Sequence, residues 1–220
     1  MTSSTPDLEH DTILAWVDRG ASVLDLGCGD GALLADLVAT KQVTACGIDI
    51  DEHAIYQCVA RGLSVFHQDL DTGLAEYTDR SFDYVILKQS LQQLRQPTFV
   101  LREATRVGRK VIVSIPNFAH YAARFQVFFR GRVPVTPILP YEWYDSPNIH
   151  FLSILDFRDF CADQRFRIEK SLFLRRNHAV RVFPNFFAET AIFLLSHSEG
   201  SAVMRAIHSG TRVLHPRRDA

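Results

Sequence analysis

The sequence of 220 residues lacks a charge excess, a long hydrophobic run and closely spaced cysteines. Its 24 basic and 25 acidic residues give a net charge of −1, so there is no general electrostatic attraction to nucleic acid or to an anionic membrane. Apolar runs such as Ala191 to Leu195 are far shorter than the ~20 residues that span a bilayer. Residues 1–11 are polar and acidic, so we expect no signal peptide. Neither nucleic acid nor a membrane is an expected partner.

Cysteine is scarce as well. The four cysteines contain no C-x-x-C pair, which favours reduced thiols in a cytoplasmic protein over a disulfide framework. No cluster of His, Cys and Asp has the spacing of metal ligands, so we expect no metal. A hydrophobic fraction of 47% with 22% charged residues is typical of a folded protein. We expect one domain over residues 1–197 and a mobile tail over 198–220, with a docked helix as the alternative for the tail.

Segments typical of strands and helices alternate along the chain. Strands are expected at 22–26, 43–50, 64–68, 82–87, 110–115, 167–174 and 188–196. Helices are expected at 32–39, 52–60, 99–107 and 153–162, after a first helix that starts at Pro6 and is capped by Thr5. This alternation predicts an α/β fold with a doubly wound, mostly parallel sheet of seven strands and an antiparallel last strand.

An aromatic, proline-rich segment interrupts the alternation at residues 117–150, after the fifth expected strand. Open α/β sheets bind ligands at the carboxyl ends of their strands, so this insertion lies where a lid or a partner surface would be useful. The alternative is a helix and loop packed on the core.

The turn after the first strand carries the strongest signal for a binding site. In Val23-Leu24-Asp25-Leu26-Gly27-Cys28-Gly29 the glycines let the backbone turn tightly and approach a ligand closely. A helix begins just beyond, so its free N–H groups and partial positive charge face the turn. We expect Asp25, at the end of the strand, to point its carboxylate toward the same crevice.

Two further acidic residues follow the next two strands. Asp49, which precedes Ile50, stands ~20 positions beyond the glycine turn, where an acid binds the two hydroxyls of a ribose. Asp69, which precedes Leu70, could accept a hydrogen bond from an adenine amino group. The alternative is that Asp49 and Asp69 cap the helices that follow them.

The stretches VLDLGCGDG, GID, QDLD and SFDYVIL together resemble the class I S-adenosylmethionine-dependent methyltransferase fold over residues 21–116. The resemblance implies that Gly27, Cys28 and Gly29 accommodate the methionine part of S-adenosylmethionine or S-adenosylhomocysteine. It also implies that Asp49 binds the ribose and Asp69 the adenine. A dinucleotide-binding unit is the competitor, because Gly27-x-Gly29-x-x-Ala32 also fits its fingerprint. The charge of Asp25 would repel a pyrophosphate, which favours the methyltransferase-like interpretation.

The stretches LKQSLQQLRQP, VGRKVIVSIPNFAHY and GRVPVTPILPYEWYDSPNIHFLSILDF extend the likeness. They resemble the MetW family of methionine biosynthesis over residues 8–174. The resemblance implies that the protein acts as a companion of a homoserine O-acyltransferase. A homodimer is possible as well. The alternative is an active methyltransferase on a small molecule or protein. No G-x-S-x-G motif is present, so acyl transfer itself would belong to another polypeptide.

A catalytic group for methyl transfer is harder to find. Lys88, Gln89 and Ser90 follow the fourth strand and should face the crevice. Asn117, His120 and His150 are the candidate catalytic residues, each with a structural alternative. A methyltransferase that uses them would bring all three to the methyl group.

Overall fold

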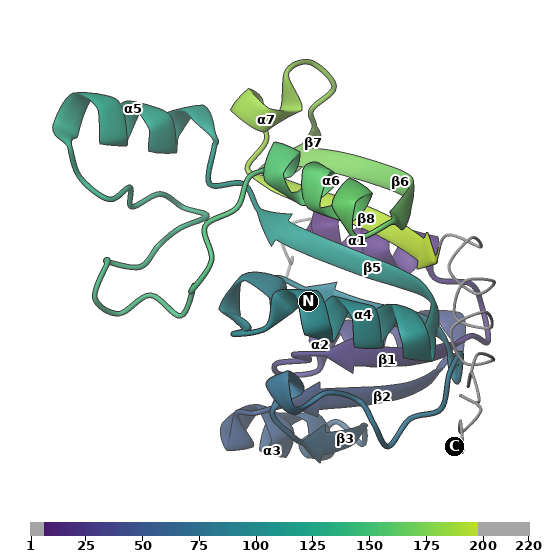
Figure 1. Cartoon of the computed structure of the whole chain (residues 1–220). Helices are drawn as coiled ribbons and strands as arrows, with labels where there is room; N and C mark the ends of the chain where they lie inside the picture. Colours follow the sequence, from purple (N-terminus) through teal and green to yellow (C-terminus); the bar gives the residue numbers. More distant parts are fainter. Residues whose placement is uncertain (1–6, 198–220) are drawn as a thin grey trace, which may run out of the picture.

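The computed structural model describes residues 7–197, which form an eight-stranded sheet flanked by helices (Figure 1). The strand order is β3-β2-β1-β4-β5-β8-β6-β7. The strands are β1 (Ser22–Leu26), β2 (Thr44–Asp49), β3 (Ser64–His67), β4 (Phe82–Lys88), β5 (Gly108–Pro116), β6 (Phe166–Arg175), β7 (His178–Ala179) and β8 (Thr190–His197). The first five are parallel, and β8 is antiparallel to both β5 and β6.

The expected count of seven strands was therefore one too few. The eighth strand, β7, has two residues and pairs with the end of β6 across a tight turn. Two residues are too short for an alternation of apolar and polar positions, so the pattern could not reveal it.

Four helices lie within two residues of the expected ranges, and the first begins later than expected. The short helix at Pro184–Phe187 was not expected, and the helix in the insertion was only an alternative. The helices are α1 (Leu8–Trp16), α2 (Ala32–Lys41), α3 (Glu52–Ala60), α4 (Pro97–Val107), α5 (Tyr121–Arg130), α6 (Ile154–Asp163) and α7 (Pro184–Phe187), with 3-10 turns η1 (Leu70–Thr72) and η2 (Leu91–Gln93). Asp7 caps α1 by accepting hydrogen bonds from the N–H groups of Glu9 and His10. The expected start at Thr5-Pro6 lies outside the described residues, and the cap is Asp7.

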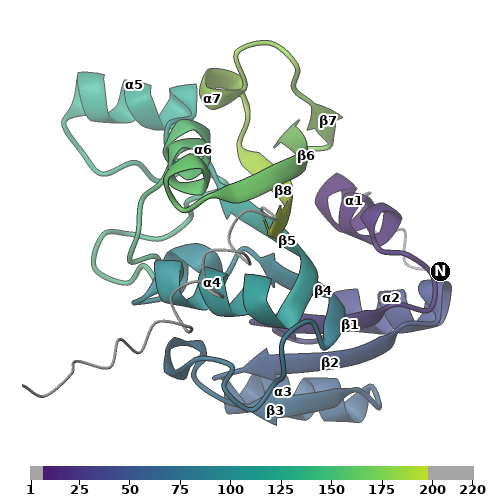
Figure 2. The same cartoon turned by 45° about the vertical axis from the view of Figure 1, so that its right-hand side comes forward.

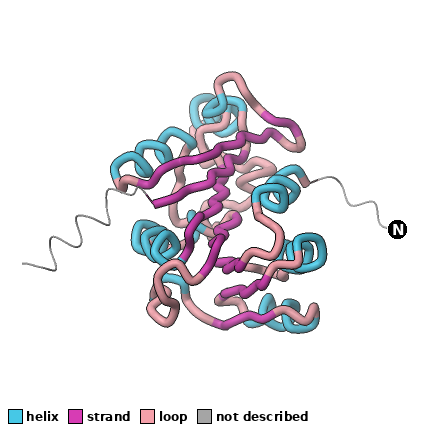
Figure 3. The backbone as a smooth tube through the Cα atoms, turned by 90° about the vertical axis from the view of Figure 1, so that its right-hand side faces the viewer, coloured by secondary structure: helices cyan, strands magenta, loops and turns pink. Residues whose placement is uncertain are grey.

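The core lies on both faces of the sheet. Helices α4 and α6 cover one face, and α1, α2 and α3 cover the other (Figure 1). Figure 3 shows helices on both sides of the sheet. Because alternate residues of a strand point to opposite faces, Val85 and Leu87 of β4 pack in one hydrophobic cluster and Tyr84 and Ile86 in the other. Burial on both faces explains why the central strands are continuously apolar.

The order of the parallel strands places a crevice at one edge of the sheet. The chain runs from β1 outward to β2 and β3, and then returns to add β4 and β5 on the other side of β1. The loops after β1 and β4 therefore diverge, and open α/β sheets bind ligands at such a point. The loops after β1, β2, β3 and β4 all begin at this edge.

The expected insertion after β5 projects from the body of the protein. Helix α5 and the loop that follows it extend away from the sheet in two views (Figures 1 and 2). The loop returns to the body at Ser153, which forms a capping box with Asp156 at the start of α6. Residues 117–152 are called the arm below.

Candidate functional site

A cleft of about 450 Å³ opens at the carboxyl edge of the parallel strands. Loops from four strands contribute to it, as the order of the strands requires. Six of the eight predicted cofactor residues line it, namely Gly27, Gly29, Asp49, Ile50, Asp69 and Leu70. Lys88, Gln89 and Ser90 line it as well. The structure thus brings most of the predicted site together in one cavity.

The glycine turn is held tightly against the loop that follows β4. The Ser90 hydroxyl, in this loop, donates to Leu26 O at 2.9 Å. On the other side, the N–H groups of Gly27 and Cys28 both donate to Ile48 O in β2. Gly27 has a φ of +80°, and a Cβ on it would lie 2.9 Å from Ser90 Cβ. Only glycine fits this position without strain, because both the conformation and the space exclude a side chain.

Asp49 connects the glycine turn to the next loop. Its Oδ2 accepts a hydrogen bond of 2.8 Å from Gly29 N–H, and its Oδ1 accepts one of 2.9 Å from Asp51 N–H. Asp51, and not Asp49, caps α3, so the alternative role of Asp49 as the helix cap is wrong. Each carboxylate oxygen has a second acceptor site, so the fixed carboxylate can still receive two hydroxyl donors.

Asp69 does cap a helical turn. Its Oδ1 accepts from Asp71 N–H at 2.9 Å at the start of η1. Asp71 in turn accepts from the N–H groups of Arg95 and Gln96, which ties this loop to the segment after η2.

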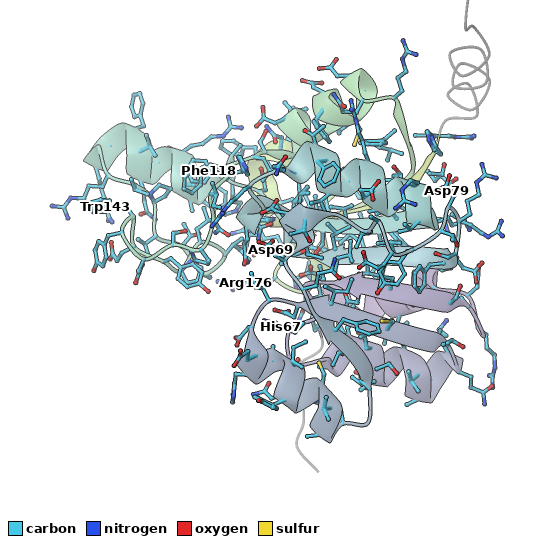
Figure 4. All side chains as sticks on the ribbon, turned by 60° about the horizontal axis from the view of Figure 1, so that its bottom comes forward. His67, Asp69, Asp79, Phe118, Trp143 and Arg176 are labelled. Atoms are coloured by element: carbon cyan, nitrogen blue, oxygen red, sulfur yellow. The ribbon has the colours of Figure 1, made fainter. Side chains whose placement is uncertain are left out.

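Ile50 lines the same cleft with 63% of its surface exposed, and offers an apolar wall. Figure 4 shows Asp69 near the loops where the strands end.

Asp25 and Cys28 do not line the cleft. Asp25 is 1% exposed, and no described residue pairs with its buried Oδ1. Burial raises the pKa of Asp25 to about 7, while the nearby charge of Lys88 opposes the shift. The Cys28 Sγ lies 3.9 Å from Cys58 Sγ, and burial raises the pKa of the Cys28 thiol. A cofactor-binding role for both residues stays a prediction.

Contacts from α1 fix the polar end of β4. Lys88 Nζ lies 3.6 Å from a carboxylate oxygen of Asp7, and the Gln89 side chain donates to Glu9 at 3.2 Å. Gln89 has a φ of +55°, a left-handed conformation that is uncommon outside glycine. Its backbone N–H is held by Ser114, so the loop after β4 turns sharply across the cleft.

The three candidate catalytic residues are not brought together. Asn117 and His120 line a separate cavity at the root of the arm, and neither lines the cleft. Asn117 is buried and donates to the carbonyls of Ala188 and Asn185, which is a structural role. His150 lines an apolar groove between α4 and α6, and its N–H donates to Gln92 O.

Six residues that line the cleft were not predicted as site residues, namely Gln68, Asp71, Gln93, Leu94, Arg95 and Ile149. The segment LQQLRQ carried the only sequence signal for three of these residues. It is a polar loop that follows the fourth strand, so it must lie at the same edge of the sheet as the other strand ends. Ile149 comes from the arm and could not be placed without the fold.

In the described residues, no group of three or more His, Cys, Asp or Glu could hold a metal ion. No helix among residues 7–197 is long and apolar enough to cross a membrane.

Solved structures with the same architecture define the fold. A chain in the complex between the Haloferax volcanii Trm112 methyltransferase activator and a putative methyltransferase matches with a TM-score of 0.65 at 17% identity, covering 87% of this chain and 90% of that one. A methyltransferase from Mesorhizobium loti that depends on S-adenosylmethionine matches with a TM-score of 0.64 at 15% identity, covering 86% and 97%. The [4+2]-cyclase SpnF matches at 0.62 with 15% identity, covering 86% and 80%. The fold is thus the Rossmann-like fold of class I methyltransferases.

Sequence comparison identifies the family. The family described as methionine biosynthesis protein MetW matches residues 7–195, and the chain belongs to this family. A bifunctional methionine biosynthesis protein MetXA/MetW from Rhodopirellula baltica is 33% identical over 201 residues, which is 86% of this chain. The chain spans about a third of the length of that relative, 32%.

Proposed function

We propose that this protein binds S-adenosylmethionine or S-adenosylhomocysteine in the cleft and acts in methionine synthesis as the companion of a homoserine O-acyltransferase. The observation that carries the proposal is the fixed carboxylate of Asp49 beside the glycine turn, in a cleft of about 450 Å³. Two acceptor oxygens match the two hydroxyls of a ribose, and the exposed face of Ile50 suits a flat base. The volume is ample for a nucleoside-sized ligand.

The ionised form of Asp25, which is populated as the pH rises above its pKa of about 7, favours a cationic ligand. A buried carboxylate without a partner for one oxygen is costly, and a nearby positive group would offset that cost. An α-ammonium and a sulfonium are both positive, whereas the pyrophosphate of a dinucleotide is negative. The electrostatics behind the glycine turn therefore support the adenosyl amino acid over NAD.

A partner is supported by the R. baltica relative, whose name joins MetXA and MetW in one polypeptide. The arm supplies a surface for such an association. Phe128, Phe129, Trp143 and Tyr144 are 81%, 71%, 74% and 70% exposed. At ~150–250 Å² for each aromatic side chain, these four leave on the order of 600 Å² of apolar surface in water. This summed area is a large share of the ~800 Å² that one partner buries in a standard interface.

Methyl transfer is the second candidate function, because the fold matches that of methyltransferases. The positions of Asn117, His120 and His150 argue against it, since none of them lines the cleft. The fold is also shared by a cyclase, so it does not by itself establish methyl transfer.

Calorimetry and a reconstituted assay test the proposal. Titration of the protein with S-adenosylmethionine, S-adenosylhomocysteine and NAD should show binding of the two adenosyl amino acids and none of NAD. Co-purification with a homoserine O-acyltransferase should yield a complex, and the rate of acylation should change when the protein is added. Absence of a complex and an unchanged rate would reject the partner role. Transfer of a labelled methyl group to any acceptor would favour the second candidate.

A further inference from the structure

A second cavity, of about 150 Å³, lies at the root of the arm, and no residue that lines it lines the cleft. The start of α5 forms one wall, the end of β6 another, and Glu189 a third. Its polar groups come from segments far apart in the sequence, yet each one is fixed by the fold.

His120 is the unusual member of the cavity. It is 7% exposed, and its Nε2 is buried with no hydrogen-bond partner in the described part of the chain. Buried polar groups in native proteins almost always have a partner, and a ligand or an ordered water supplies one where the protein does not. The imidazole thus offers a hydrogen bond that the protein itself leaves unused.

The N-terminus of α5 adds further donors. Tyr121 and Ala122 are the first two residues of this helix of ten residues, and both line the cavity. Their N–H groups can have no partner within the helix, and neither makes a hydrogen bond to another described backbone group. The helix begins without a side-chain cap, so its partial positive charge faces the cavity uncompensated.

Charges of both signs complete the cavity. The Arg175 guanidinium donates to the Tyr121 hydroxyl at 2.7 Å and lies over its ring, 5.1 Å from the centroid, so it is held in place. The Glu189 Oε2 accepts from Arg176 N–H at 2.8 Å. The backbone of Glu189 is anchored by hydrogen bonds to Asn117 and Leu174. Arg175, Arg176 and Glu189 therefore line one small cavity, in which the Arg175 guanidinium and the Glu189 carboxylate are held in place.

We propose that this cavity binds a small α-amino acid. The carboxylate of the ligand would accept from His120, the free N–H groups of α5 and Arg175, and its ammonium would donate to Glu189. A plain anion such as phosphate would satisfy the donors but would meet the Glu189 carboxylate. An amine alone would leave the donors unsatisfied. The zwitterion uses both halves of the cavity.

Calorimetric titration of the full chain with L-alanine, L-homoserine, propionate and phosphate tests the proposal. Both amino acids should bind at least tenfold more tightly than propionate or phosphate. Asp49→Ala should retain this binding, since Asp49 belongs to the cleft. No saturable binding of an amino acid, equal or tighter binding of phosphate, or loss of binding in Asp49→Ala would overturn the proposal.

Variants of the cavity test the roles of single residues. His120→Phe replaces the imidazole by an apolar ring and so removes the unpartnered nitrogen. The variant should be as stable as the wild type or more stable, and it should bind amino acids at least tenfold more weakly. Glu189→Gln keeps an acceptor for Arg176 N–H and should weaken the amino acids but not propionate. Arg175→Gln should weaken both, whereas Arg167→Gln, at the exposed opposite end of β6, should weaken neither. Wild-type affinity in a folded His120→Phe protein would overturn the proposal.

Discussion

The Asp49 Oδ2 accepts a hydrogen bond of 2.8 Å from the N–H of Gly29, twenty residues earlier in the chain. This bond joins the turn after β1 to the end of β2, so the acid and the glycine turn form one rigid unit. Gly47 helps to hold the unit together, because a Cβ at this position would lie 2.6 Å from Cys28 Sγ. The absence of a side chain at Gly47 lets the turn pack directly on β2.

Replacement of Asp49 by alanine should weaken the binding of S-adenosylhomocysteine by about 1–3 kcal/mol, the scale of a hydrogen bond to a charged group. The variant loses both the acceptor for the ribose and the bond to Gly29 N–H. Calorimetric titration of the two proteins measures the difference.

The control for Asp49→Ala is Glu52→Ala, which removes an exposed acid from the first turn of α3. Its affinity should equal that of the wild type. An unchanged affinity in folded Asp49→Ala would remove the ribose role from this residue.

Two glycines of the turn should differ in their tolerance of alanine. Gly27→Ala forces a Cβ to within 2.9 Å of Ser90 Cβ at a φ of +80°, whereas a Cβ on Gly29 meets nothing within 4 Å at a φ of +54°. We expect Gly29→Ala to lower the free energy of unfolding by about 1 kcal/mol from backbone strain alone, and Gly27→Ala by about 2–3 kcal/mol. Urea denaturation of both variants measures the difference. Equal losses would show that the contact with Ser90 relaxes.

The sequence was sufficient to predict the parallel half of the sheet, because its strands are buried on both faces and end in glycine or acidic turns. Tertiary contacts decided the rest. The position of Asn117 at the end of β5 suggested a catalytic residue, but the return of β8 beside β5 gives its side chain two backbone carbonyls to bind. Ile149 reaches the cleft only because the arm folds back, and no local pattern encodes that path.

Asp25 should make the stability of the protein fall as the pH rises. Burial raises the pKa of Asp25 from 3.8 to about 7, so between these values the folded state holds a proton that the unfolded state has released. Stability from this group is therefore full below pH ~4 and lost as the pH approaches ~7, by up to about 4 kcal/mol.

Asp25→Asn should remove this dependence. The free energy of unfolding of the variant, relative to the wild type, should increase from pH 5 to pH 8, as measured by urea denaturation at each pH. All other titrating groups are common to both proteins and cancel in the comparison. A difference that stays constant with pH would show that Asp25 is ionised throughout.

The arm should contribute to association and little to folding. Phe128 and Trp143 are 81% and 74% exposed, and Figure 4 shows Trp143 far from the sheet, with Phe118 nearer to it. The double variant Phe128→Ser, Trp143→Ser should therefore keep its free energy of unfolding within about 0.5 kcal/mol, since exposed side chains lose few contacts. Its affinity for a homoserine O-acyltransferase should fall by at least 2 kcal/mol, because exposed aromatic residues dominate the binding energy of interfaces.

Tyr56→Ser, on α3 and 71% exposed, is the matched control and should bind as the wild type does. If the double variant and the control bind the acyltransferase equally well, the partner surface lies elsewhere on the protein.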